Sequence, residues 1–425
     1  MLSVAHQNRS LGLHFLSISF IAIVSFGCHS TRPADMPQGD VQVQIPLSIG
    51  EGDHVEYQLK NVVLKKIESL RHVRGAFAQF YYTPGLKNNR LDGVSPLAFF
   101  IQTAHQLFIP KDELSTQMAT MYYHFQELNL AAIDLGLNEW VSNTAQVAIQ
   151  ARVMDEDSQI MKNNAFFDGS SQSFVFVPFD LNDLPITVNG GIIAHEFFHS
   201  IFYKLIYEVI QKKNIPIAQK IHSQTTHNEM TDLENMTQQD LFNETYLRGL
   251  NEGLADYWAW SYTTDYDFLK WSLSAETGKR TLKKQPISYE TTKDIENEIT
   301  RANVNSDYPS QYLGRYIYEI GTGYARFLKT LTELISEENE ISLEAAKREV
   351  ALQLISYLKT LPIQINDLKK HESLKVNSLF LFFAQDAHGR KMKLKQCQHI
   401  RDYLAYDGDQ FECQTELNFF KVVKK

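Results

Sequence analysis

The chain has few cysteines, no excess of basic charge and no internal repeat, and each absence narrows its possible class. Three cysteines among 425 residues allow at most one disulfide. The formal net charge of −9 argues against a nucleic-acid-binding protein, which would usually carry a basic face. No motif recurs at a spacing of about 20–50 residues, so a solenoid or propeller is not expected. The sequence contains no EF-hand-like loop, so a dependence on calcium is not implied. The 44% of hydrophobic residues suffice for one large or two medium cores.

The N-terminal segment is apolar and almost uncharged. Residues 1–27 contain no acidic residue, and Arg9 is their only Lys or Arg. An apolar run over residues 11–27 precedes Cys28, and this pattern is typical of an export signal. Residues 25–28 (Ser-Phe-Gly-Cys) resemble a bacterial lipobox, in which Cys28 becomes the acylated first residue. We therefore expect an exported lipoprotein held at a membrane, facing the periplasm or the cell exterior. An uncleaved membrane anchor is the alternative.

The other two cysteines lie near the C-terminus. If Cys28 carries lipid, Cys397 and Cys413 remain as an even pair in an oxidising compartment. We expect them to form a disulfide that closes a short C-terminal loop. Two free buried thiols are the alternative.

Hydrophobic periodicity divides the chain into a sheet-bearing first part and a mostly helical second part. Alternating or β-branched content predicts the strands, at residues 55–65, 76–82, 145–153 and 174–177. Helical spacing predicts the long helices, at residues 114–135 and about 191–211. A polar insertion is expected at 212–240. The pattern favours an α+β fold with a tether at 28–45, a sheet-bearing part at 46–190 and a helical part at 191–425.

A metal-binding motif lies inside the second predicted helix. His195-Glu196-Phe197-Phe198-His199 places both imidazoles on one helix face, one turn apart, so that both can reach one ion. Glu196 lies about 100° further around the helix, where it could take a proton from an attacking water. Zinc favours such nitrogen ligands. The alternative is a pair of ordinary surface or core histidines.

A second pair of polar residues could complete the site. Glu252 and Asp256 are four residues apart on a predicted helix rich in aromatic residues. Two carboxylates on one face of an apolar helix are costly unless they are paired or bind a cation. Glu252 could be the third metal ligand and Asp256 the partner of a ligand histidine. A solvated acidic pair is the alternative.

These motifs together resemble a known family. HExxH followed by NExxxD, with Asn251 and Glu252 beginning the second motif, resembles the gluzincins and most closely the thermolysin-like metallopeptidases. Residues 164–169 (Asn-Ala-Phe-Phe-Asp-Gly) resemble that family's edge-strand segment, which pairs with the substrate backbone over the metal. The resemblance covers roughly residues 110–330. It implies a two-part fold in which the HExxH helix lies between a mixed sheet and a mainly helical subdomain.

The resemblance also implies roles for individual residues. His195, His199 and Glu252 would bind zinc, Glu196 would be the general base, and Asp256 would support His195. In addition, Asn164 and Ala165 would bind the substrate backbone. The implied activity is hydrolysis of peptide bonds in a peptide or protein substrate. An endopeptidase is favoured, because no acidic anchor for a substrate amino group appears near Asn164.

The sequence departs from the family where the oxyanion would be stabilised. The corresponding region, residues 308–316, contains no histidine. Tyr308, Tyr312 and Arg315 are the candidates to polarise the scissile carbonyl. A packing tyrosine or a surface arginine is the alternative at each position. The missing histidine keeps a second hypothesis open, a zinc- or peptide-binding lipoprotein with weak or no catalysis.

Overall fold

The computed structural model describes most of the chain beyond the N-terminal segment. The described residues are 38–87, 90–141, 144–154, 158–212, 238–283, 297, 309–368, 374, 378–389, 393–404, 410–411 and 422–423. The predicted signal peptide, Cys28 and nearly all of the predicted insertion therefore lie outside the described residues. Within the described ranges, no helix is both long and apolar enough to cross a membrane.

The first sheet has five strands in the order β3-β2-β1-β8-β7. Its strands are β1 (Gly39–Ile49), β2 (Glu56–Ser69), β3 (Arg74–Gly75), β7 (Phe100–Gln102) and β8 (Phe108–Pro110). β1 pairs with β2 in an antiparallel hairpin and with β8 in parallel. Alternate β1 residues Val41, Val43 and Ile45 are buried, as the period of two requires. The predicted tether at 28–45 is therefore wrong from Gly39 onward, because pairing with β2 makes this segment a strand.

The second sheet has four strands in the order β10-β11-β9-β4. Its strands are β4 (Ala78–Tyr82), β9 (Ala145–Ile149), β10 (Ala165–Asp168) and β11 (Ser173–Phe176). β4, β9 and β11 are parallel, and β10 is antiparallel to β11 at the edge. A small hairpin, β5 (Leu86–Lys87) and β6 (Arg90–Leu91), lies apart from both sheets. The strands thus form two main sheets where one was expected.

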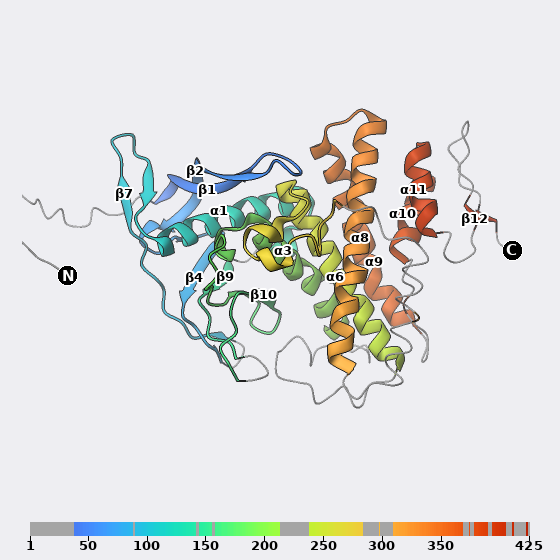
Figure 1. Cartoon of the computed structure of the whole chain (residues 1–425), viewed down its shortest axis with the longest axis horizontal. Coiled ribbons are helices and arrows are strands. Elements are labelled where there is room, and N and C mark those ends of the chain that lie inside the picture. Colours follow the sequence, from blue (N-terminus) through green and yellow to red (C-terminus); the bar gives the residue numbers. More distant parts are fainter. Residues whose placement is uncertain are drawn as a thin grey trace, which may run out of the picture. The chain divides into compact units, whose positions relative to one another are not determined.

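Two helices connect the sheets to the rest of the molecule. α1 (Glu113–Asp134) begins at Asp112, whose side chain accepts a hydrogen bond from the Ser115 amide. It contacts β1, β2, β4 and β8 as well as α3 (Gly190–Phe202). Figure 1 shows α1 between the β1–β2 hairpin and the strands β4 and β9. α3 continues through a π-helical turn, η3 (Tyr203–Tyr207), into α4 (Glu208–Lys212). The short helix α2 (Asn138–Val141) follows α1.

The second part of the chain is mainly helical, as predicted. Its elements are α6 (Gln238–Thr263), η6 (Phe268–Trp271), η7 (Ser274–Glu276), α8 (Pro309–Asn339), α9 (Leu343–Asp367), α10 (Ser378–Gly389), α11 (Leu394–Leu404) and the small hairpin β12 (Gln410–Phe411) and β13 (Val422–Val423). α6 contacts α3 on one side and α8 on the other, and α8 contacts α9. The α+β prediction, with mixed strands first and helices after, is confirmed.

α6 and α8 approach each other closely at two glycines. A Cβ added to Gly253 would lie 2.1 Å from the carbonyl oxygen of Gly321, closer than any non-bonded atoms can lie. A Cβ on Gly321 would in turn lie 3.3 Å from the Cβ of Glu252. The two glycines therefore let α8 pack directly behind the predicted ligand Glu252.

Candidate metal centre

α3 presents the two histidines on its buried part. Asn189 caps the helix, and its side chain accepts hydrogen bonds from the amides of Gly191 and Ile192 at 3.0 and 3.3 Å. Its amide group donates to the carbonyl of Phe268 at 2.9 Å, which ties the helix start to the segment after α6. His195 and His199 lie further along the helix, one turn from each other, with their ring centroids 4.5 Å apart. The cap and the α-helical period together fix both imidazoles.

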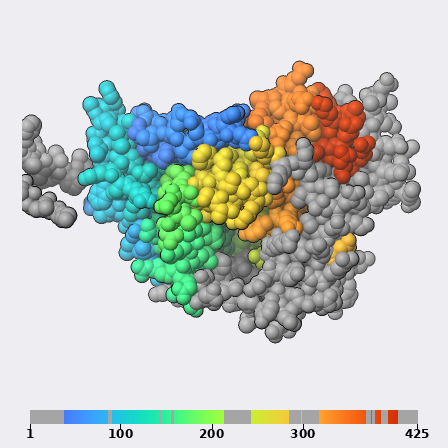
Figure 2. All heavy atoms as spheres, in the orientation of Figure 1, coloured from blue at the N-terminus to red at the C-terminus, as the bar shows by residue number. Residues whose placement is uncertain are grey.

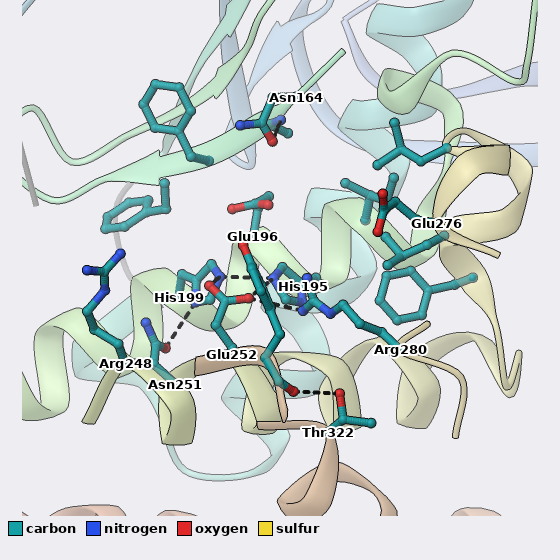
Figure 3. Close-up of a pocket in the computed structure, with 18 of the residues that line it drawn as sticks. Asn164, His195, Glu196, His199, Arg248, Asn251, Glu252, Glu276, Arg280 and Thr322 are labelled. Carbon is teal, nitrogen blue, oxygen red and sulfur yellow. Dashed lines mark hydrogen bonds and ion pairs between the residues drawn. The ribbon is translucent and has the colours of Figure 1, made fainter. Parts of the chain in front are cut away.

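α6 brings the carboxylates to the histidines. His195 Nδ1 lies 3.0 Å from Asp256 Oδ1, while its Nε2 lies 3.4 Å from Glu252 Oε2. His199 Nε2 lies 3.6 Å from Glu252 Oε1. Its Nδ1 contacts Asn251 Oδ1 at 2.9 Å. Each imidazole therefore directs Nε2 to a shared point and has its Nδ1 held by an α6 side chain (Figure 3).

Three of these residues could hold a metal ion. One ligand atom each from His195, His199 and Glu252 lies within 4.8 Å of the other two. The two Nε2 atoms are 3.0 Å apart. Each histidine has an α6 side chain beside its Nδ1, a hydrogen-bonded Asn251 at His199 and an ion-pair contact with Asp256 at His195. Such outer partners usually orient imidazoles around a metal.

The charges at the site favour a cation between the side chains. Burial lowers the pKa of His199 to about 4, so that this imidazole is neutral and able to ligate near pH 7. Burial also acts to lower the pKa of His195, but its contacts with Asp256 and Glu252 outweigh burial and raise that pKa to about 9. Although burial would raise the pKa of Glu252, the nearby histidines and Arg280 hold it well below its usual range. Positive charge is thus stabilised at this point.

Glu196 has the character expected of a proton acceptor. It is 5% exposed, and no described residue hydrogen-bonds to its Oε2. Burial raises the pKa of its carboxyl to about 8, and a cation nearby would lower it again. Figure 3 shows this carboxylate pointing toward Asn164. A buried carboxylate oxygen of this kind is costly unless the site supplies it with a partner.

Two residues of the site, Arg280 and Asn251, were not predicted from the sequence to contribute to it. Arg280 donates to both Asp256 oxygens, at 3.0 and 2.6 Å, and to Glu252 Oε2 at 3.0 Å. Asn251 was noted only as part of a motif, and it orients His199. Arg280 follows 24 residues after Asp256 in irregular chain, so no helical spacing could have indicated it.

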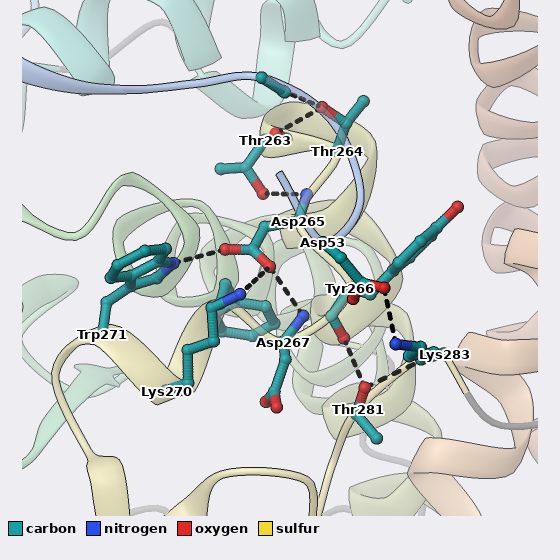
Figure 4. A network of polar contacts seen from close by, with 12 residues as sticks. Asp53, Thr263, Thr264, Asp265, Tyr266, Asp267, Lys270, Trp271, Thr281 and Lys283 are labelled. Carbon is teal, nitrogen blue, oxygen red and sulfur yellow. Dashed lines mark hydrogen bonds and ion pairs between the residues drawn. The ribbon is translucent and has the colours of Figure 1, made fainter. Parts of the chain in front are cut away.

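The segment that carries Arg280 is tied to the β1–β2 turn (Figure 4). Asp265 is buried and accepts hydrogen bonds from the Asp267 amide at 2.9 Å and from Trp271 Nε1 at 2.6 Å. The amide of Gly52 donates to the Thr264 carbonyl, and Lys283 pairs with Asp53 at 2.6 Å. These contacts hold residues 264–283 against the first sheet and so position Arg280.

His195, His199 and Glu252 line a cavity of about 1150 Å³. Asn164 and Ala165, the predicted substrate-binding residues, also line it, at the start of the edge strand β10. The Asn164 side chain accepts a hydrogen bond from the Ala165 amide at 2.9 Å. Figure 2 shows the surface hollowed near the green, yellow and orange segments, which include β10, residues 264–283 and α8. The cavity thus has a strand as one wall and helices as others.

The remaining predicted residues have no described contacts at the site. Tyr308 lies outside the described residues, and Tyr312 and Arg315 lie on α8 with side chains outside them. The oxyanion-stabilising role therefore stays a prediction. Cys397 is buried and disulfide-bonded, while its predicted partner Cys413 lies outside the described residues.

No protein-family model matches this chain, and no curated protein matches it.

Proposed function

We propose that this protein is a zinc-dependent peptidase of the thermolysin-like gluzincin type, in which His195, His199 and Glu252 hold the zinc and Glu196 is the general base. The observation that carries the proposal is the convergence of these three side chains beside a buried carboxylate in a large cavity. Two histidines and a glutamate with an open fourth position are typical of catalytic rather than structural zinc.

The spacing of the three ligand groups fits zinc. A tetrahedral centre with bonds of about 2.0–2.1 Å holds its ligand atoms about 3.3–3.4 Å apart. The corresponding separations here are 3.0 Å between the two Nε2 atoms, 3.4 Å from His195 Nε2 to Glu252 Oε2 and 3.6 Å from His199 Nε2 to the other carboxylate oxygen, Oε1. The site would therefore need little rearrangement to bind the ion.

Bound zinc would polarise the scissile carbonyl and lower the pKa of water to about 7. Glu196 would accept the proton of the attacking water and return it to the leaving amine. Asp256 and Arg280 would not touch the substrate in this scheme. They would keep His195 and Glu252 in their positions.

The position of β10 at the edge of its sheet favours a peptide as the substrate. An extended chain can add to such an edge through main-chain hydrogen bonds, which give affinity with little dependence on sequence. β10 begins at Ala165, beside Asn164, and Figure 3 shows Asn164 above Glu196. A peptide paired with β10 would therefore pass over the ligand group, by which we mean His195, His199 and Glu252.

The test is hydrolysis of a quenched-fluorescence peptide library by zinc-loaded protein beginning at residue 29, with the zinc content measured. We expect cleavage by the parent. Glu196→Gln should retain about one zinc per chain and lose at least about a hundredfold in rate, because the base contributes on that order. A parent that binds zinc and cleaves no peptide would instead favour the binding-protein hypothesis. If neither protein binds zinc, the metal site is wrong.

A further inference from the structure

We propose that Arg248 makes the cavity select peptides with an acidic side chain on the His199 side of the scissile bond. The inference rests on the proposed peptidase function and names its substrate class. Its evidence is the position of Arg248, the pairing of the other basic residues that line the cavity, and the geometry of an extended peptide.

The position of Arg248 on α6 places it next to the ligand group. It precedes Glu252 by four residues and therefore lies on the same helix face, one turn away. Asn251, which contacts His199, follows it by three residues. Figure 3 shows Arg248 and Asn251 on the His199 side of the cavity, with Arg280 and Glu276 on the other side.

The other basic side chains that line the cavity have close partners. Arg280 bonds to Glu252 and Asp256 at 2.6–3.0 Å. Lys279 pairs with Glu276 at 2.8 Å, and Arg326 is buried with its Nε donating to the carbonyl of Thr281. These contacts satisfy their charges within the protein.

Arg248 differs from this group. Its side chain is 52% exposed, and its ion pair with Glu244 is long, at 4.0 Å from Nη1 to Oε1, which is beyond hydrogen-bonding distance. A guanidinium with donors directed into a cavity can bind a carboxylate through two parallel hydrogen bonds.

Aromatic side chains line the same cavity as Arg248. Tyr203 and Tyr207 of η3 line the same cavity, and both are largely buried. Low-polarity walls strengthen an ion pair with a substrate carboxylate relative to one in water.

The distance along α6 from Glu252 to Arg248 corresponds to about two residues of an extended peptide. One helical turn is about 5.4 Å, whereas an extended peptide advances about 3.3 Å per residue. A peptide paired with β10 would therefore bring a side chain within reach of Arg248 at about the second residue from the scissile bond. Because side chains alternate between faces, a carboxylate should be favoured at one position and not at its neighbours.

The experiment measures kcat/KM for matched peptides that carry Glu, Gln or Lys at each position around the scissile bond. We expect the zinc-loaded parent to prefer Glu over Gln by about tenfold at one position on the His199 side, as for a charge-assisted pair. Arg248→Gln should bring the ratio to about one, Arg248→Lys should restore part of it, and Arg248→Glu should favour Lys. Lys279→Gln, a change of the same charge in the same cavity, should leave the ratio unchanged.

Two outcomes would overturn the inference while the peptidase proposal stands. The parent could cleave peptides with a Glu/Gln ratio near one at every position, or Arg248→Gln could keep the parent's preference. If the parent cleaves nothing, the peptidase proposal fails, and binding of the same peptides by fluorescence anisotropy decides the inference separately. Tighter binding of the Glu peptide that disappears in Arg248→Gln would support it, and equal binding would reject it.

Discussion

At the scale of single residues, the candidate site consists of ligands and of the groups that hold them. His195 faces Glu252 through one nitrogen and Asp256 through the other. The Nδ1 contact fixes the ring orientation and leaves Nε2 for the metal. Asp256 should therefore affect metal binding although it would not touch the ion.

Replacing Asp256 by Asn tests this role. We expect the dissociation constant for zinc to rise about 10–100-fold, because an outer-shell carboxylate orients the ligand and increases its basicity. Zinc affinity would be measured by competition with a chelating dye, and folding by far-ultraviolet circular dichroism. Asp134→Asn, at an exposed aspartate paired with Arg348, should bind zinc as the parent does. Unchanged affinity in Asp256→Asn would show that the carboxylate does not hold His195.

Glu244, on the buried face of α6, predicts a dependence of stability on pH. Burial raises the pKa of this carboxyl from 4.5 to about 7, against the opposing charge of Arg248. Since the folded-state pKa is the higher one, the stabilisation is fully present below about pH 4.5 and is lost as the pH rises through 7. Glu244→Gln removes this loss.

The measurement is urea unfolding at about pH 5 and pH 9. Between these values, the free energy of unfolding should fall by about 2–3 kcal/mol more in the parent than in Glu244→Gln. Glu337→Gln, at an exposed glutamate, should follow the parent. Parallel curves for the parent and Glu244→Gln would contradict the raised pKa.

At the scale of elements, the site depends on how closely α6 packs between α3 and α8. The contact of Gly253 with Gly321 leaves no room for a side chain, and Glu252 is the adjacent residue. A displacement of α6 at this crossing would therefore move Glu252, the proposed metal ligand.

Gly253→Ala should destabilise the protein by about 1–3 kcal/mol, because overpacking outweighs the gain in helix propensity. It should also weaken zinc binding. Gly249→Ala on the same helix is the matched variant, since its added Cβ would lie 3.1 Å from the nearest atom instead of 2.1 Å. We expect Gly249→Ala to lower the free energy of unfolding clearly less than Gly253→Ala does. Thermal unfolding and zinc titration of both variants provide the comparison, and equal stability of Gly253→Ala and the parent would rule out the tight crossing.

At the scale of the whole molecule, His195, His199 and Glu252 bring together α3, which contacts β10 of the second sheet, and α6 of the helical part. An ion bound by both helices stabilises the folded state over the unfolded one by mass action. Metal content should therefore affect global stability as well as activity.

Removing zinc with a chelator should lower the melting temperature by several degrees, since free zinc at a hundred times the dissociation constant contributes about 2.7 kcal/mol. Calorimetry with and without zinc measures the shift. His199→Ala should abolish it, whereas His105→Ala, at an exposed histidine outside the site, should preserve it. A shift that persists in His199→Ala would place the stabilising zinc elsewhere.

The sequence by itself determined the local parts of the candidate site. The α-helical period puts His195 and His199 on one face, and the same period joins Glu252 to Asp256, because spacing within one helix needs no tertiary information. The long helix at 113–134 and the alternation of sheet-bearing and helical parts were predictable for the same reason.

Only the tertiary structure decided which distant segments meet. Arg280 reaches Glu252 and Asp256 because residues 264–283 are held against the β1–β2 turn by contacts that leave no periodic pattern in the sequence. The start of β1 at Gly39 was likewise set by pairing with β2, beyond the range of local propensity. The exposure of Arg248 in the cavity also follows from packing, since spacing along α6 defines a face of the helix but not what that face meets.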